Sequence, residues 1–350
     1  MNKFLAEIME QPQALEKTLQ YYLSEEGKSL LEKVKNGIDT NQFEQIVFTG
    51  MGSSYFTSIA ASTLFNNLGI HSFSINASEL LHYNSSILTK KTLLICFSQS
   101  GESFEIIELL KKLPTSVFCV AISNEENSTL AKSANIILPS KAGKEEMTST
   151  KTYVSTTLVS FIVGWSLAGK WNDEKINSIK TLIKNFKLNL ESYHSWVDNA
   201  ISFIGDMPAL SIIARGPGIS TAYQSGLMFK ETTKIPAFGV LGGEFRHGPM
   251  EMVQEGFKSI LFASKGKTLL QSIKMAEDIA LLGGKVILIT NAQLNIANDN
   301  ILILPIEAQN DFLFSIQSII PIQLFIDSYT KNKGYEAGNF IVGAKVTMVE

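Results

Sequence analysis

The fold is decided by residues 45–54, QIVFTGMGSS, where an apolar run typical of a buried strand leads into a glycine turn. Residues 210–220, LSIIARGPGIS, repeat this pattern, and Gly50 and Gly216 are 166 positions apart. The same offset relates two further pairs of segments, residues 94–98 with 260–264 and residues 137–139 with 303–305. Agreement in three separated places indicates an internal duplication, and therefore two copies of one structural lobe.

Short apolar runs alternate with helical patterns in both copies. In the first copy we expect strands near residues 45–49, 71–75, 92–97, 116–122 and 135–138, with helices near 53–68, 102–112 and 126–133. In the second copy we expect strands near residues 209–214, 236–240, 258–263, 285–290 and 301–304. Because parallel strands need crossover connections, this alternation predicts an α/β fold of two doubly wound parallel-sheet lobes.

Three segments follow from this pattern. We expect an N-terminal helical segment at residues 1–40, a first lobe at 41–165, and a second lobe with a C-terminal tail at 200–350. The helices outside the two sheets are expected near residues 10–35, 151–200 and 308–332, the last despite Pro321.

The composition narrows the class of protein. The 350 residues carry 30 Lys and Arg against 33 Asp and Glu, a net charge of −3, and 45% of them are hydrophobic. Such a balance gives no electrostatic reason to expect nucleic-acid or anionic-membrane binding. No apolar run reaches the roughly 18 residues of a membrane span, and the first seven residues show no signal-peptide pattern. We therefore expect a cytoplasmic globular protein.

The residue pattern contains no signature of a cofactor or metal site. Cys96 and Cys119 lie in apolar strand-like runs, which predicts buried structural thiols. The chain has no Cys-x-x-Cys and no closely spaced His pair, so it lacks a zinc signature. Gly50-x-Gly52 lacks the third glycine of a dinucleotide fingerprint. We expect neither a metal nor an organic cofactor.

The strongest local signal is a serine-rich turn between a strand and a helix. Residues 96–103, CFSQSGES, place Ser98, Ser100 and Ser103 around a glycine, just before the helix expected near residue 102. A helix N-terminus offers unpaired N–H groups and a partial positive charge, and the serine hydroxyls add donors. An ordinary N-cap needs only one hydroxyl. The pattern therefore predicts an anion site, with a phosphate as its ligand.

Two further clusters carry groups suited to proton transfer and carbonyl chemistry. Glu231 lies on the helix after the second glycine turn, and His247 follows a glycine pair. A carboxylate can move a proton between adjacent sugar carbons, and a histidine can move the hydroxyl proton that opens a sugar ring. Lys345 lies near the end of the chain, where an amine in apolar surroundings could attack a carbonyl and a surface lysine would only be solvated.

These clusters, in this order, resemble the sugar isomerase (SIS) domain family, in particular the isomerase half of glutamine–fructose-6-phosphate aminotransferase. The resemblance extends over essentially the whole chain, from residues 7–12 and 52–54 through 98–103, 149–151, 230–231 and 244–249 to the closing residues 344–350. The set is specific for the family and leaves the substrate open.

The resemblance implies a site for a sugar 6-phosphate. Glu231 would move a proton between C1 and C2, His247 would open the ring, and Lys345 would contact the open-chain carbonyl or form an imine with it. The implied substrate-binding residues are Ser53, Ser54, Ser98, Gln99, Ser100, Ser103, Met147 and Ala344. The resemblance also implies a homodimer in which His247 serves the neighbouring subunit's site.

Two departures from the aminotransferase pattern argue against the aminotransferase reaction. Met228 stands where the family's aminotransferase has a lysine, three residues before the proton-transferring glutamate. The sequence begins Met1-Asn2-Lys3, so we also expect it to lack the glutamine-hydrolysing domain with its N-terminal cysteine nucleophile. We therefore expect no glutamine-dependent synthesis by this chain alone.

The expected reaction is that of the stand-alone two-lobe branch of the family. We rank an amino-sugar-6-phosphate deaminase/isomerase first, because Glu231, His247 and Lys345 are all retained. Close alternatives are a fructosamine-6-phosphate deglycase, a plain ketose/aldose phosphate isomerase, and an aminotransferase-like isomerase without a glutaminase. The contrasting class is a non-catalytic sugar-phosphate sensor, which would usually carry a basic DNA-binding segment before the first strand.

Overall fold

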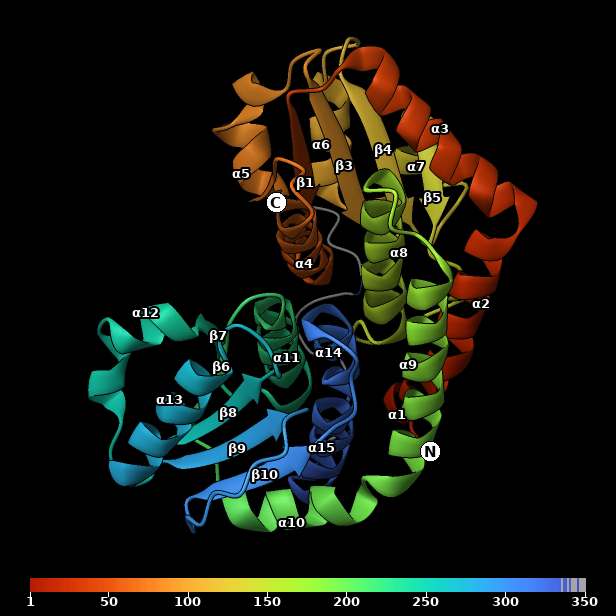
Figure 1. Cartoon of the computed structure of the whole chain (residues 1–350). Helices are drawn as coiled ribbons and strands as arrows, with labels where there is room; N and C mark the ends of the chain where they lie inside the picture. Colours follow the sequence, from red (N-terminus) through yellow and green to blue (C-terminus); the bar gives the residue numbers. More distant parts are fainter. Residues whose placement is uncertain (335, 339, 341–344, 346–350) are drawn as a thin grey trace. The chain divides into compact units, whose positions relative to one another are not determined.

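The computed structural model describes residues 1–334, 336–338, 340 and 345, and divides the chain into two compact units. The first unit is Glu10–Lys180 with the described tail residues Phe340 and Lys345. The second unit is Met1–Met9 with Thr181–Asn339. Each unit is built around one parallel sheet (Figure 1).

The two sheets have the same topology. The first sheet consists of β1 (Gln45–Gly50), β2 (Ser72–Asn76), β3 (Thr92–Ser98), β4 (Phe118–Ser123) and β5 (Ile136–Pro139), in the order β2-β1-β3-β4-β5. The second sheet consists of β6 (Leu210–Ala214), β7 (Ala237–Leu241), β8 (Lys258–Ala263), β9 (Lys285–Thr290) and β10 (Ile301–Pro305), in the order β10-β9-β8-β6-β7. Read from its other edge, the second order repeats the first, which confirms the duplication. Every strand begins and ends within two residues of its predicted bounds.

Helices cover both faces of each sheet, as expected for parallel strands joined by crossovers. The first unit contains α2 (Gln11–Leu23), α3 (Glu25–Asn41), α4 (Ser53–Asn67), α5 (Ala77–His82), η1 (Ser85–Ile87), α6 (Phe104–Lys112), α7 (Thr129–Ser133) and α8 (Lys151–Leu167). The second unit contains α1 (Lys3–Met9), α10 (His194–Ile204), α11 (Gly218–Thr233), α12 (Gly242–Arg246), η2 (Pro249–Met252), α13 (Leu269–Leu281), α14 (Asp311–Gln317) and α15 (Ile319–Asn332). The bounds of α9 are Asp173–Ser192.

Alternation along β1 and β3 builds the core of the first unit. Phe48 lies against Phe65 of α4, with ring centroids 4.9 Å apart, and against Phe97 of β3 at 5.9 Å. Val47, one residue earlier, belongs to a different buried cluster, which also contains Ile106 of α6. Figure 1 shows α4 and α8 on one side of this sheet and α6 on the other. The apolar runs are continuous because both faces of the sheet are buried.

Three predicted helices are each divided into shorter ones. The helix expected near residues 10–35 ends at Leu23, and Ser24 caps α3 by accepting from the Gly27 N–H at 3.2 Å. The stretch expected near residues 151–200 becomes α8, α9 and α10, and Gly169 lies in the left-handed region just after α8. Local caps and turns thus interrupt patterns whose apolar periodicity is continuous.

The helix predicted over residues 308–332 is divided at Ser318 into α14 and α15. Pro321 is the third residue of α15, where the missing N–H interrupts no bond within that helix. Residues Asp311–Asn332 are long and apolar enough to cross a membrane by composition alone, but 89% of their most apolar window is buried inside the fold. Such burial is typical of core helices in globular domains.

Candidate functional site

The serine residues predicted to bind a ligand lie where the strand order of the first sheet reverses. β1 continues to β2 on one side, and β3 continues to β4 on the other. The carboxyl ends of β1 and β3 therefore form a topological switch point, where ligands of open α/β sheets bind. Ser53 and Ser54 begin the helix that follows β1, and Ser98 ends β3.

Close packing at Gly50 brings these two loops together. A Cβ added to Gly50 would lie 2.9 Å from the Ser54 Cβ and 3.0 Å from the Phe97 carbonyl oxygen, so the turn after β1 lies directly on the end of β3. Real Cβ atoms do not approach that closely, which explains the glycine at this position. Backbone contact thus places the Ser53-Ser54 turn beside the serine loop, which we define as residues 98–103.

Internal hydrogen bonds shape the serine loop. The Ser98 Oγ accepts from the Gly101 N–H at 2.9 Å, and the Ser100 Oγ accepts from the Glu102 N–H at 3.2 Å. Glu102 in turn accepts from the Thr129 N–H through Oε1 at 2.7 Å. Ser103 occupies the N-cap position of α6 without a side-chain capping bond. The Ser103 hydroxyl is therefore available to a ligand at the helix N-terminus.

Gly101 is the position at which this loop tolerates least change. Its φ is +66°, and an added Cβ would lie 2.1 Å from the Ser128 Oγ. We expect Gly101→Ala to lower the free energy of unfolding by about 2–4 kcal/mol, from left-handed strain and overpacking together. Gly69→Ala is the matched control, since Gly69 has φ +83° but nothing within 4 Å of an added Cβ.

Urea unfolding of the two variants measures the difference. We expect Gly69→Ala to cost only about 1 kcal/mol, because it carries the strain alone. Equal losses in the two variants would contradict the assignment of Gly101 to a close approach against Ser128.

A second group of predicted residues meets in the same unit. Lys345 donates from Nζ to the Met147 carbonyl oxygen and to the Glu145 Oε2, the latter at 2.7 Å. The structure thus brings together two of the predicted site residues, although they are 198 positions apart. The sequence left open whether the Lys345 amine lies in apolar surroundings or is solvated at the surface, and the structure places a carboxylate beside it. Ala344, predicted as a binding residue, lies outside the described residues.

Asn124 connects the serine loop with the segment that leads to Met147. The Asn124 N–H donates to the Gln99 carbonyl at 3.3 Å, and the Asn124 Nδ2 donates to the Gly143 carbonyl at 2.9 Å. The Asn124 Oδ1 accepts from the Ser140 Oγ and from the Ala142 N–H, each at 3.0 Å. The Asn124 side chain thereby fixes the course of the chain from β5 toward the segment that contacts Lys345.

Glu145 belongs to this group and was not predicted from the sequence. Its side chain is fully buried and accepts hydrogen bonds from Thr150, Thr152 and Lys345. Burial alone would raise the pKa of Glu145, but the Lys345 ammonium and the bonds from both threonines hold that pKa below its usual value. The signal in the sequence was a carboxylate followed closely by hydroxyl residues; the partner 200 positions away gave no local sign.

The predicted proton-transfer residues belong to the second unit. Glu231 lies half-buried in the last turn of α11, and His247 is exposed and follows α12 directly. Met228, which stands where the resemblance leads us to expect a lysine, is fully buried on α11. Among the described residues, no group of three or more His, Cys, Asp or Glu is arranged to hold a metal ion.

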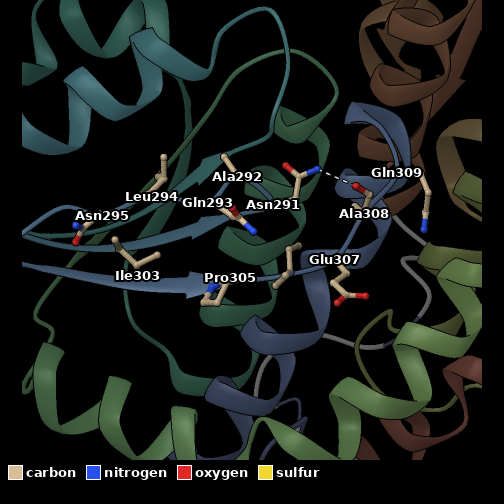
Figure 2. Close-up of a pocket in the computed structure, with 11 residues that line it drawn as sticks. Asn291, Ala292, Gln293, Leu294, Asn295, Ile303, Pro305, Glu307, Ala308 and Gln309 are labelled. Carbon is tan, nitrogen blue, oxygen red and sulfur yellow. Dashed lines mark hydrogen bonds between the residues drawn. The ribbon is translucent and has the colours of Figure 1, made fainter.

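A separate cavity of about 830 Å³ lies in the second unit, beyond the carboxyl ends of β9 and β10 (Figure 2). Amide side chains such as those of Gln293 and Gln309 line it, together with Glu307. Asn291 closes one side by donating from Nδ2 to the Ala308 carbonyl at 3.0 Å. None of the predicted site residues is among those lining this cavity.

Comparisons with known proteins agree with this architecture. An isomerizing glutamine–fructose-6-phosphate aminotransferase of Methanothermobacter thermautotrophicus is 27% identical over 337 residues, which cover 95% of this chain and 55% of that protein. The chain thus spans about half the length of this curated relative.

Two solved structures share the fold over nearly the whole chain. The C-terminal domain of glucosamine-fructose-6-phosphate aminotransferase from Francisella tularensis superposes with a TM-score of 0.85, at 24% identity, covering 97% of this chain and 98% of that one. Glucosamine-6-phosphate deaminase from Thermotoga maritima superposes with a TM-score of 0.73, at 19% identity, covering 99% of each chain. A family model described as the SIS domain matches residues 41–163 and 207–327, so this chain belongs to the SIS domain family and carries two copies of that domain.

Proposed function

We propose that this chain is a phosphosugar enzyme that works at C1 and C2 of an amino-sugar 6-phosphate, as a deaminase/isomerase. The observation that carries the proposal is the serine loop at the switch point of the first sheet, where Ser98, Ser100 and Ser103 surround a helix N-terminus. Membership of the SIS family supports it, as do the sugar phosphates after which its structural relatives are named.

Each residue has a defined task in this proposal. The serine loop, which includes Gln99, binds the phosphate together with Ser54. The three phosphate oxygens accept hydrogen bonds from hydroxyl and backbone N–H donors. His247 moves the hydroxyl proton that opens the ring. Glu231 takes the proton from C2 and returns it to C1, which converts the 2-amino aldehyde into a 2-imine. Water then replaces the imine nitrogen, and ammonia leaves together with the ketose 6-phosphate.

The same proton transfer without an amine is aldose–ketose isomerisation, and this is our second candidate. Buried Met228 favours it, because the lysine that the aminotransferases carry there is absent. A deglycase moves the proton in the opposite direction, from C1 to C2 of a fructosamine 6-phosphate, and water then releases an amino acid from the C1 imine and leaves an aldose 6-phosphate. An aminotransferase-like reaction would consume ammonia supplied from elsewhere.

A substrate panel separates these reactions. We expect the purified chain to release ammonia and fructose 6-phosphate from glucosamine 6-phosphate. The panel also contains fructosamine 6-phosphates, fructose 6-phosphate with added ammonia, and tagatose 6-phosphate. If one of these compounds is turned over and glucosamine 6-phosphate is not, the reaction of that compound replaces the deaminase as the assigned function. Binding without turnover of any panel member would support the sensor and contradict the enzyme.

The implied dimer remains part of the proposal. His247 is exposed on the single chain, which leaves it accessible to a site on a second copy. A solution mass twice that of one chain is expected, and a purely monomeric chain with full activity would exclude a role of His247 across subunits.

A further inference from the structure

The short helix α12, which is followed directly by His247, is fixed to the rest of its unit at several points. Phe245 is fully buried in the core of the second unit, and its ring centroid lies 6.0 Å from that of Phe257. At the start of the helix, the Gly242 carbonyl accepts from the Arg215 Nη2 at 2.8 Å. A helix of five residues has little stability of its own, so its tertiary contacts decide where it lies.

The last residue of α12 is fixed by an ion pair. The Arg246 Nη1 lies 2.6 Å from the Oδ2 of Asp278 on α13, and the Lys274 Nζ lies 2.7 Å from the Asp278 Oδ1. Desolvation alone would raise the pKa of Asp278, but the bonds from Lys274 and Arg246 hold that pKa below its usual value. Asp278 is therefore a carboxylate at neutral pH, and each of its oxygens meets a cation.

This ion pair lies one residue from His247. The His247 N–H donates to the Glu244 carbonyl at 2.9 Å, and the following residue, Gly248, has a φ of +135°. Because glycine adopts such a φ far more readily than other residues, the chain can leave the helix directly after His247. The backbone that carries the imidazole is thus the end of α12, and Arg246 holds that end on α13.

We propose that Asp278 is a positioning residue, which fixes the end of α12 through Arg246 and so holds His247 where it moves the ring-opening proton. Asp278 does not touch the substrate in this assignment. The inference rests on the proposed function, in which His247 opens the ring. A displacement of about 1 Å at a catalytic group can cost about 10²-fold in rate, so a contact outside the site can control the reaction.

Two ketose phosphates separate ring opening from proton transfer between carbons. Fructose 6-phosphate closes a ring through its C5 hydroxyl, whereas 5-deoxyfructose 6-phosphate lacks that hydroxyl and stays open-chain. With ammonia present, we expect Asp278→Ala to slow conversion of fructose 6-phosphate by about 10–10²-fold. We expect the same variant to change conversion of the 5-deoxy compound by less than about twofold. Initial rates are measured by mass spectrometry of the products.

Two further variants serve as matched controls. Glu277→Ala removes the neighbouring exposed carboxylate of α13, and Lys274→Met removes one cation from Asp278 but leaves its pair with Arg246. We expect neither substitution to change either rate. An equal loss on both ketose phosphates, or no loss on either, would overturn the positioning role, since a destabilised chain would convert both compounds more slowly.

The route through Arg246 is tested by a double-mutant cycle. We expect Arg246→Met to reproduce the loss seen in Asp278→Ala, and the double variant to add nothing further, because both substitutions break the same contact. Losses that add independently would show that Asp278 acts by another route and would contradict the proposal.

Hydrogen exchange tests the anchoring of α12 without a substrate. We expect the amide hydrogens of residues 242–252 to exchange about tenfold faster in Asp278→Ala than in Glu277→Ala, because the end of the helix opens more often. Equal exchange in the two variants would overturn the inference even where the proposed function holds. A His247→Asn variant that converts both ketose phosphates at the wild-type rate would instead contradict ring opening by His247, and with it the proposed function.

Discussion

Glu231→Gln is expected to lower turnover of the sugar 6-phosphate by about 10²–10⁴-fold, the usual contribution of a general base. Glutamine keeps the size and hydrogen-bonding shape of the side chain but cannot take a proton from carbon. Because the phosphate is bound by the serine loop in our assignment, we expect ligand affinity to change by less than about threefold. Initial rates and calorimetric binding of the same panel compound measure both quantities.

The control for this result is Glu277→Gln, which removes an exposed carboxylate on α13 of the same unit. We expect it to leave turnover unchanged. Thermal unfolding of both variants excludes misfolding as the cause of a lost rate. Unaffected turnover in Glu231→Gln would mean that another group moves the proton, and the proposed mechanism would then be abandoned.

The double variant Ser98→Ala with Ser100→Ala is expected to weaken binding of the 6-phosphate by about 10²-fold or more. A hydrogen bond to a charged group contributes about 1.5–3 kcal/mol, so each lost hydroxyl accounts for about tenfold or more. The loss also includes the internal bonds that these two hydroxyls accept from the Gly101 and Glu102 N–H groups.

The matched control removes two hydroxyls that lie outside the serine loop. Ser133 and Ser178 each donate to a carbonyl of their own helix at 2.8 Å, and we expect their double replacement by alanine to leave affinity unchanged. A panel compound without its phosphate adds a second check. If the Ser98 and Ser100 variant loses no affinity relative to this control, the serine loop is not the phosphate site.

Local patterns were sufficient for most of the fold. The strands could be predicted because a parallel strand buried on both faces is a continuous apolar run, bounded by turn residues, as at residues 92–98. Helix ends were predicted less well. The helix is divided at Ser318, and the new helix begins there so that Pro321 falls in its first turn. Apolar periodicity gives no sign of this division.

The candidate site, like the fold, could be predicted only in part. The serine loop was predictable because all its residues are neighbours in the chain and its helix N-terminus is a local feature. The neighbourhood of Lys345 was not. Its partners Glu145 and Met147 precede it by about 200 residues, and a lysine close to the end of a chain carries no local sign of what it contacts.

The sequence by itself determined that this protein is a duplicated α/β fold, because strand and helix periodicities and the 166-residue offset are properties of consecutive residues. It also placed the serine loop at the end of β3. Only the tertiary structure decided that the Gly50 turn lies on that loop, and that the Lys345 amine is bonded to a buried carboxylate. The physical reason is that close backbone approach and ion pairing depend on where distant segments meet, and that is fixed by packing of the whole unit.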